Sequence, residues 1–355
     1  MLGDDSARSP APSVLGRPCF AMASCLALSA CDPSAPLEFP ATPQLYATST
    51  LTCIVADDGG LDCWGSLARF SNGRAQMFAP IASVSDAHGL ECGLTVMARV
   101  SCWRAQEAPR PIVSLEQAVE LGNGCAVTSA GEVRCWDAEG TEARPLRGLG
   151  PIVEVEGNRD YGCARGQHGE VRCWSRAGRP RRLGIDDAVD IALHGEGVWV
   201  VHTSGRVSEY RSPSGRWRSG LDEAEREVVG IDDAVEVDGE RGACARRSTG
   251  EVACWHGGGY QPLFPDWDER GAYEAYAVPG ITDAVELVVN SALDGVAHAC
   301  VRLSAREPDE LGVHCWGVLY DNWPAHRVAI EPEAVAPSRV RRIAGPRADA
   351  TDSGP

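Results

Sequence analysis

The chain has 355 residues, of which 44% are hydrophobic, and it contains 39 glycines and 23 prolines. This composition is typical of a folded protein with many short strands and turns rather than long helices. The formal charge is −17, and the sequence contains no lysine, so every basic side chain is an arginine. We expect no nucleic-acid partner, because no run of basic residues is present to bind phosphates. No segment reaches the ~18–20 consecutive apolar residues that a membrane-spanning helix needs.

Residues 1–31 have the pattern of a bacterial lipoprotein signal peptide. Arg8 and Arg17 precede an apolar run over residues 19–30, whose length suits the core of a signal peptide. Leu28-Ser-Ala-Cys31 follows the pattern of a lipobox, which predicts that Cys31 is lipidated and becomes the first residue after cleavage. An ordinary signal peptide that contains cysteine is the alternative. The Pro-rich residues 32–43 predict a tether, so we expect the following domain in the bacterial cell envelope, attached to the membrane only by its lipid.

A hairpin motif recurs along the rest of the chain. In its clearest copy, Cys125-Ala-Val-Thr-Ser-Ala-Gly-Glu-Val-Arg-Cys135-Trp136, two strands flank a tight turn. Five other copies keep both cysteines and the tryptophan, and they begin at Cys53, Cys92, Cys163, Cys244 and Cys300. The fifth copy along the chain, Trp199 to Tyr210, lacks both cysteines but keeps the Ser-Gly-x-Val turn. Seven copies at roughly 33–56-residue spacing indicate a propeller or solenoid.

A second apolar–polar alternation precedes most of these hairpins. It is found at residues 118–121, 152–155, 187–191, 233–237 and 283–287, and it predicts a strand with one buried face. Pieces with Pro and Gly, such as residues 144–150, would supply a fourth, outer strand, because Pro is tolerated at a sheet edge. We therefore predict an all-β, seven-bladed β-propeller of four-stranded antiparallel blades over residues 44–345, followed by a disordered tail at 346–355. Residues 340–345 resemble the start of another repeat and are predicted to pair with the first blade, closing the ring.

The ten-residue spacing of the cysteines predicts disulfides. In a hairpin that turns around Ala130, residues 125 and 135 are directly opposed, with Cα atoms ~4.5–5.5 Å apart, which a disulfide can bridge. Cys19 and Cys25 leave with the signal peptide and Cys31 carries the lipid, so 12 of the 15 cysteines remain. The predicted pairs are Cys53–Cys63, Cys92–Cys102, Cys125–Cys135, Cys163–Cys173, Cys244–Cys254 and Cys300–Cys315. An exported domain would retain such bonds.

Zinc binding is the competing interpretation of the cysteines, and we do not expect it. Two cysteines opposed on one hairpin do not form a Cys-x-x-Cys knuckle, and only His298 and His314 lie beside any pair. The tryptophan after each second cysteine is expected to fill the layers between blades, with ligand binding as the alternative. These residues are Trp64, Trp103, Trp136, Trp174, Trp255 and Trp316.

A strand of Ala-Val type followed by Cys-Ala-x-x-Ser-x-Gly-x-Val-x-Cys-Trp resembles the regulator of chromosome condensation repeat. The likeness is to the cysteine-bearing form in exported bacterial proteins and lipoproteins, and it covers nearly all of the mature chain. The resemblance implies a seven-bladed propeller used as a binding scaffold. The Gly-Gln-Leu-Gly loop usual after the tryptophan is missing here, so shorter blades are expected. The guanine-nucleotide exchange activity of the eukaryotic member is not implied, because its loops have no match.

The longest insertion, residues 256–276, is the main candidate for function. It holds five aromatic residues among acidic ones, and the segment 319–323 adds two more aromatics. Aromatic side chains contribute much of the energy of protein interfaces, so these residues predict an interaction surface. Packing of an outer strand and its loop is the alternative. The candidate binding residues are Tyr260, Phe264, Trp267, Tyr273, Tyr276, Tyr320 and Trp323.

No catalytic, metal or cofactor motif is present: there is no Gly-x-Ser-x-Gly elbow, no His-Glu-x-x-His and no phosphate-binding Gly loop. The sialidase propeller has a superficially similar repeat, the Asp box, but its Ser-to-Trp span differs and its aspartate is missing here. We therefore predict a non-enzymatic, monomeric lipoprotein that binds a protein or a glycan. The alternative is a hydrolase of extracellular glycans with its site in the central channel, which convergent carboxylates and arginines there would favour.

Overall fold

The computed structural model describes the strands and most of the turns of the repeat region. The described residues are 45–47, 51–56, 59–65, 75–77, 81–87, 90–104, 108–137, 139–157, 160–175, 179–194, 197–211, 224–239, 242–256, 271–291, 297–304, 312–322, 325–334 and 341–346. All of them belong to one compact unit, Pro36–Pro355. The predicted signal peptide, lipidation site and tether lie outside the described residues.

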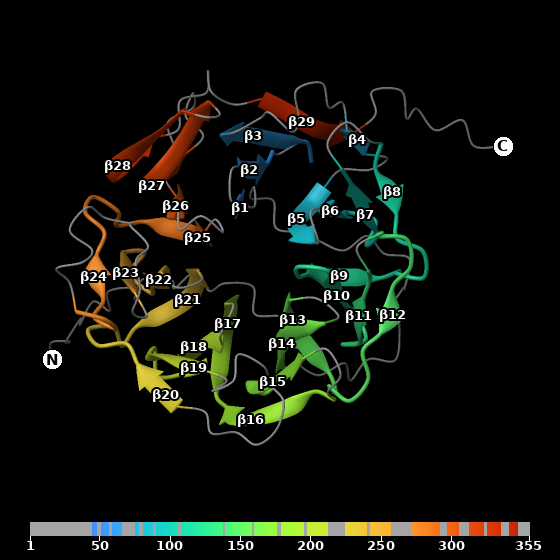
Figure 1. The fold of residues 1–355 in the computed structure, drawn as a ribbon, viewed down its shortest axis with the longest axis horizontal. Helices are drawn as coiled ribbons and strands as arrows, with labels where there is room; N and C mark the ends of the chain where they lie inside the picture. Colours follow the sequence, from blue (N-terminus) through green and yellow to red (C-terminus); the bar gives the residue numbers. More distant parts are fainter. Residues whose placement is uncertain are drawn as a thin grey trace, which may run out of the picture. The chain divides into compact units, whose positions relative to one another are not determined.

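Seven sheets, called blades 1 to 7, form a ring (Figure 1). Blade 1 contains β1 (Leu45–Ala47), β2 (Leu51–Val55), β3 (Leu61–Gly65), β4 (Ala75–Met77) and β29 (Arg341–Pro346). Blade 2 contains β5 (Ile81–Ala87), β6 (Leu90–Thr95), β7 (Val100–Trp103) and β8 (Arg110–Pro111). Blade 3 contains β9 (Ala118–Leu121), β10 (Cys125–Thr128), β11 (Val133–Cys135) and β12 (Arg144–Pro145).

The other four blades repeat this order. Blade 4 contains β13 (Ile152–Gly157), β14 (Tyr161–Gly166), β15 (Glu170–Ser175) and β16 (Arg181–Asp186). Blade 5 contains β17 (Ala188–His194), β18 (Gly197–His202), β19 (Val207–Arg211) and β20 (Ala224–Glu227). Blade 6 contains β21 (Ala234–Gly239), β22 (Gly242–Arg247), β23 (Val252–His256) and β24 (Tyr276–Ala277). Blade 7 contains β25 (Ala284–Ser291), β26 (Ala297–Leu303), β27 (Val313–Asn322) and β28 (Ala325–Ala334).

This arrangement confirms the predicted all-β, seven-bladed propeller. In blades 2 to 7 the strands are antiparallel, and the first strand of each blade lies innermost (Figure 1). The five segments predicted from the alternation are the inner strands β9, β13, β17, β21 and β25. The outer strands of blades 2, 3 and 6 are only two residues long. Within the described residues, no helix is long and apolar enough to cross a membrane.

The repeated hairpin has the predicted register. Cys125 and Cys135 are directly opposed on β10 and β11, and the corresponding cysteines are opposed in every cysteine-bearing blade. All six predicted pairs lie at disulfide distance, with Cα atoms 3.9–4.1 Å apart. The glycine of the Ser-x-Gly turn, for example Gly131 with φ +75°, adopts a left-handed conformation that other residues rarely take.

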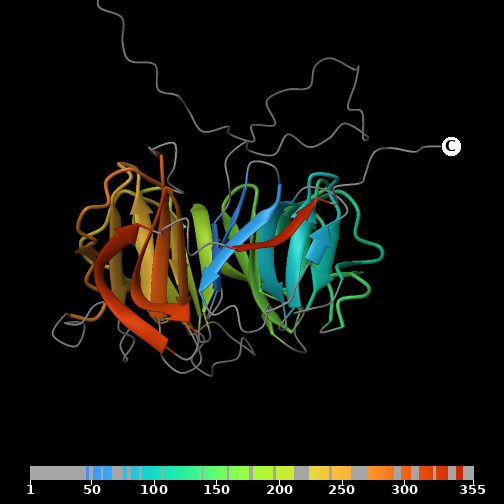
Figure 2. The ribbon, with the colours of Figure 1, turned by 90° about the horizontal axis from the view of Figure 1, so that it is seen from above.

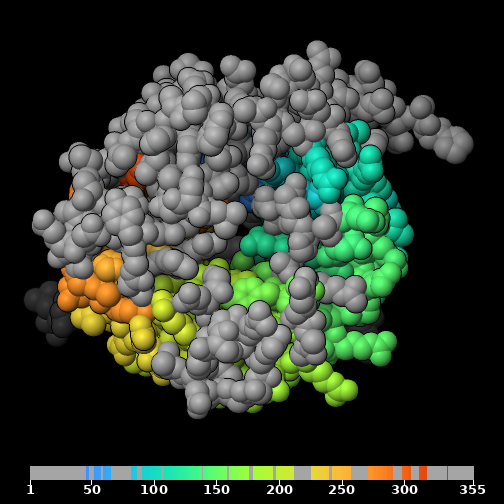
Figure 3. All heavy atoms as spheres, in the orientation of Figure 1, coloured from blue at the N-terminus to red at the C-terminus, as the bar shows by residue number. Residues whose placement is uncertain are grey.

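The blades are held together by a buried cluster at each of the seven interfaces. The tryptophan of one blade packs with the two cysteines of the preceding blade: Trp136 of blade 3 shares a cluster with Cys92 and Cys102 of blade 2. The same arrangement places Trp103, Trp174, Trp316 and Trp64 with the cysteines of blades 1, 3, 6 and 7. The tryptophans therefore fill the layers between blades, as predicted. Figure 3 shows the coloured atoms of blades 3 to 6 packed side by side.

The C-terminal strand completes blade 1, as predicted from residues 340–345. Strand β29 pairs antiparallel with β3, with Arg341 opposite Cys63 and Arg342 opposite Asp62. On its other side it pairs in parallel with β4, which gives blade 1 a fifth strand that the sequence did not predict. In Figure 2 the red strand β29 lies against the blue strand β3. The two ends of the repeat region are thus joined in one sheet.

Removal of residues 341–355 is expected to lower the melting temperature. The truncation removes β29, so β3 and β4 each lose a neighbouring strand and the ring is no longer closed. If the lost pairing contributes roughly 2 kcal/mol or more, the melting temperature should fall by roughly 3 °C or more for a domain of this size. The matched control is a chain that ends at Pro346, which keeps β29. Thermal unfolding followed by circular dichroism checks the prediction, and equal melting temperatures for the two truncated chains would contradict it.

Candidate binding site

The inner strands carry carboxylates that converge on the ring axis. Four of them accept backbone N–H groups of the next blade's inner strand. The Asp190 carboxylate accepts from the N–H of Val237 at 2.7 Å, and the Asp238 carboxylate accepts from Val289 at 2.7 Å. The innermost strand of each blade has an edge without a neighbouring strand, so its N–H groups need other acceptors. These carboxylates therefore belong to the construction of the ring.

Arginines on the second strands neutralise part of this charge. Arg165 lies 2.5 Å from Glu154, Arg246 lies 2.6 Å from Glu236, and Arg302 lies 2.6 Å from Glu286. Each pair joins the first and second strands of one blade, in blades 4, 6 and 7. Carboxylates and arginines thus converge, as the hydrolase alternative requires, but each of these arginines is paired with a carboxylate of its own blade.

Two inner-strand carboxylates, Glu120 and Glu156, have no hydrogen-bond partner among the described residues. Burial, reinforced by the nearby charge of Glu154, raises the pKa of Glu120 to about 8. The same two causes raise the pKa of Glu156 well above its usual value. Both side chains are half-buried, so some solvent contact remains. Within the described part of the chain, no group of three His, Cys, Asp or Glu side chains is placed to hold a metal ion.

Blade 5 departs from the repeat at the positions of the two cysteines. Trp199 and Glu209 occupy these positions and are directly opposed in register, as the cysteines are in the other blades. The Trp199 ring packs edge-on against Trp255 of blade 6, with ring centroids 5.4 Å apart. Trp255 therefore meets an indole where the other tryptophans meet cysteines. On the opposite side of blade 5, Tyr210 takes the place of the tryptophan and packs with Cys163 and Cys173 of blade 4.

Glu209 is a fully buried carboxylate, with 0% of its surface exposed. Its Oε2 accepts a hydrogen bond of 2.6 Å from the Tyr273 hydroxyl. Its Oε1 lies 2.7 Å from Arg211 Nε and 3.2 Å from His194 Nε2, at angles outside those of a hydrogen bond. A buried carboxylate is costly unless charges or donors compensate it, and these three side chains supply the compensation. We call Glu209, Tyr273, His194, Arg211 and Trp199 the blade 5–6 junction.

Tyr273 connects this junction to the long insertion. It is one of the predicted binding residues and follows residues 257–270, which lie outside the described part of the chain. Arg226 of blade 5 donates to the Tyr273 hydroxyl at 3.1 Å and stacks over its ring, 5.4 Å from the centroid. Burial, followed by the hydrogen bond to Glu209, raises the pKa of Tyr273. The phenolate is therefore disfavoured, which argues against Tyr273 as a nucleophile.

Of the other predicted binding residues, Tyr276 alone has a described side chain, and it lies outside the junction. Tyr276 lies on the outer strand β24 and its hydroxyl contacts Gly271 and Glu274, which agrees with the packing alternative for this residue. Tyr320 lies on β27, where its side chain is outside the description. Tyr260, Phe264, Trp267 and Trp323 lie outside the described residues. Sequence reasoning missed Glu209, His194 and Arg211, although the exchange of both cysteines in the fifth repeat was a visible signal.

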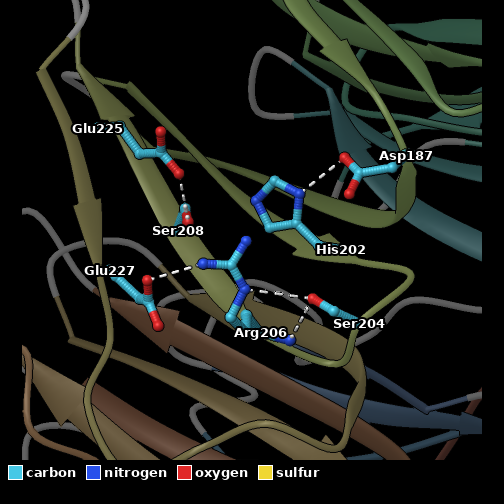
Figure 4. Close-up of polar contacts among 7 residues, drawn as sticks. All are labelled: Asp187, His202, Ser204, Arg206, Ser208, Glu225 and Glu227. Atoms are coloured by element: carbon cyan, nitrogen blue, oxygen red, sulfur yellow. Dashed lines mark hydrogen bonds and ion pairs between the residues drawn. The ribbon is translucent and has the colours of Figure 1, made fainter.

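A second polar group on blade 5 includes a His–Asp pair (Figure 4). His202 Nδ1 lies 2.8 Å from Asp187, whereas Ser208 contacts Glu225 and Arg206 lies between Ser204 and Glu227. Other blades have an equivalent contact between the residue before the inner strand and the hairpin turn. These are Asp233 with Arg247, Asp283 with Ser304, and Gln117 with Ser129. The His–Asp pair is therefore the blade 5 form of a structural contact and does not define a catalytic dyad.

No protein-family model and no curated protein matches the chain. Among solved structures, the computationally designed Ika8 protein has a TM-score of 0.50 at 12% identity, over 85% of this chain and 92% of that one. Prp20p from Saccharomyces cerevisiae has a TM-score of 0.46 at 10% identity, over 82% and 76%. Human WBSCR16 has a TM-score of 0.45 at 13% identity, over 82% of each chain. The first likeness supports the fold alone, and the other two are too slight to add an argument.

Replacement of Glu120 by Gln is expected to stabilise the protein at alkaline pH. The folded state holds the Glu120 proton up to a pKa of about 8, whereas the unfolded chain releases it near 4.5. The stability from this group is therefore present below pH 4.5 and lost as the pH rises to 8. We expect Glu120→Gln to add about 1–3 kcal/mol at pH 8 and little at pH 4. Urea unfolding at both pH values checks this, with the exposed Glu116→Gln as control. An equal gain at both pH values would contradict it.

Proposed function

We propose that this protein is an exported, lipid-anchored scaffold that binds another protein at the face of the ring beside blades 5 and 6, without catalysis. The observation that carries the proposal is the blade 5–6 junction. Elsewhere in the described ring, the cysteines and tryptophans repeat between blades, and four of the inner carboxylates accept backbone N–H groups of the next blade. At this interface the repeat is replaced by a buried polar group that holds one end of the aromatic insertion.

Strand register supports a common face for the candidate segments. In blade 5, Gly197 is paired with both His194 and Arg211, so the end of β17 and the end of β19 lie at the same side of the ring. In blade 6, Gly242 is paired with His256, where the insertion begins. In blade 7, β27 runs past Trp316 to Asn322 toward the same side. The segments 257–270 and 323–324 therefore both leave strands at one face.

Two observations support export. The sequence of residues 1–31 has the order of a lipoprotein signal, and it ends at Cys31. The six cysteine pairs at disulfide distance suit an oxidising compartment, because such bonds are rare where thiols are kept reduced. The acidic charge of −17 suits a soluble domain held outside the membrane by its anchor.

A glycan hydrolase in the ring axis is the less favoured function. The carboxylates there accept backbone N–H groups of the next blade or pair with arginines, and these roles leave them unavailable as an acid–nucleophile pair. Glu120 and Glu156 lie on adjacent blades, and the raised pKa of each favours the protonated form. A retaining or inverting mechanism needs one carboxylate to be ionised.

Lipidation at Cys31 is expected to be lost in a Cys31→Ser variant. Cells that express the protein are labelled with an alkyne analogue of palmitate, and the label on the purified protein is compared with that on a Cys19→Ser variant. The wild-type and Cys19→Ser proteins should carry the label and sediment with membranes, because the thioether forms at Cys31 alone. A labelled Cys31→Ser protein, or a wild-type protein without label, would remove the anchor from the proposal.

Partner capture is expected to depend on the insertion. The purified wild-type protein is compared with one in which residues 257–270 are replaced by a short Gly-Ser linker, using solubilised envelope as the source of partners. The control replaces residues 305–311, which join β26 and β27 at the opposite face. A partner that is retained by wild type and control, lost from the first variant and destroyed by protease supports the proposal. A partner sensitive to periodate but not to protease would indicate a glycan, and equal capture by all three proteins would overturn the site.

A further inference from the structure

We propose that Glu209 and Tyr273 form a latch that fixes the C-terminal base of the insertion, residues 271–275, against blade 5. In this view the fifth repeat has a glutamate at the position of the second cysteine because a hydrogen bond to the neighbouring blade replaces a bond within the hairpin. The role of the latch in binding rests on the proposed function, whereas its effect on residues 271–275 does not.

The position of Glu209 limits what its carboxylate can contact. It lies on β19 opposite Trp199, inside the interface between blades 5 and 6. Arg211 and His194, which approach Oε1, both belong to blade 5. Tyr273 comes from the chain of blade 6 and supplies the well-aligned hydrogen bond to Oε2. The bond is therefore an inter-blade contact, unlike the disulfide that occupies this place in the other blades.

Tyr273 is held at this position by its backbone as well. Its N–H donates to the carbonyl of His256 at 2.9 Å, and its carbonyl accepts from Val229 of blade 5 at 2.7 Å. The N–H of Ala275 then donates to the carbonyl of Val229 at 2.8 Å. The φ of Tyr273 is +64°, a left-handed value that a bulky residue adopts only when its surroundings impose it. The hydrogen bond to Glu209 acts together with these backbone contacts to hold Tyr273 in this conformation.

The latch also brings aromatic rings together at the interface between blades 5 and 6. The Tyr273 ring lies 6.2 Å from Trp199, which in turn lies 5.4 Å from Trp255. Arg226 closes the outer side by stacking on Tyr273. His256, where the insertion starts, is hydrogen-bonded to Tyr273, where the chain has returned. Both ends of residues 257–270 are thus fixed at one point, which lowers the entropy lost when the segment binds a partner.

The test compares Tyr273→Phe with the matched variant Tyr46→Phe, since each loses one hydroxyl that donates to a glutamate of a neighbouring blade. Hydrogen exchange is followed at the amides of Tyr273 and Ala275, and at Val127 of blade 3 as a reference for the rest of the ring. Loss of a hydrogen bond to a buried carboxylate should accelerate exchange at the first two amides by roughly tenfold in Tyr273→Phe. Exchange at the amides of Tyr273 and Ala275 in Tyr46→Phe, and at Val127 in both variants, should be unchanged. Unchanged exchange in Tyr273→Phe, or equal acceleration at Val127, would overturn the latch.

A second variant and a second measurement distinguish the effect of the latch on residues 271–275 from its role in partner binding. Glu209→Gln keeps an acceptor oxygen of similar size but removes the charge, so it should accelerate the same amides less than Glu209→Ala does. Partner capture by Tyr273→Phe should fall at least severalfold relative to Tyr46→Phe. Faster exchange with undiminished capture would refute the role in binding and keep the latch. If the linker replacement of residues 257–270 also leaves capture intact, the proposed site itself fails, independently of the exchange result.

Discussion

The contact between a tryptophan and the cystine of the preceding blade is the interaction on which the ring depends. Burial of one indole removes ~150–250 Å² from water, worth about 4–6 kcal/mol at ~25 cal/mol per Å². The disulfide by itself contributes about 2–3 kcal/mol in the chain-entropy model. The contact of each cystine with the tryptophan of the next blade therefore contributes more to the free energy of unfolding than the disulfide itself. This contact is present at five of the seven interfaces, and buried clusters around Tyr210 and Trp199 take its place at the other two. Stability is therefore spread around the ring without one central core.

The inner strands have one edge without a neighbouring strand, and their N–H groups there find acceptors on side chains. Each inner strand would expose a row of N–H groups toward the axis, and side chains of the preceding blade accept several of them. Among the carboxylates that do so, burial, followed by the nearby charges of Glu154 and Glu236, raises the pKa of Asp190. Arginines in blades 4, 6 and 7 offset part of that cost. The acidic ring axis is thus in part a consequence of construction, since four of its carboxylates accept backbone N–H groups of the next blade.

Much of this architecture was readable from the repeat, because hairpin register, cysteine spacing and apolar alternation are local patterns. The pairing of Cys125 with Cys135 and the inner strand at 118–121 are examples. The junction was not readable for a physical reason. Glu209 and Tyr273 lie 64 residues apart and meet only once blades 5 and 6 are packed. The sequence showed that Trp199 and Glu209 replaced two cysteines, but no local rule states which distant group a buried carboxylate will find. The pairing of β29 with β4, which gives blade 1 its fifth strand, was also not predicted.

The insertion of β29 between β3 and β4 has a consequence for how the chain reaches its final form. Every cystine links residues only 10 or 15 positions apart, so each hairpin can be oxidised soon after its own residues emerge. Blade 1, in contrast, waits for the last strand of the ring, and loop closure over such a separation is slow. Blade 1 is therefore the first blade to be synthesised and the last to obtain all of its strands. Until then β3 and β4 present open edges, and this interval is when the chain is most exposed to pairing with another molecule.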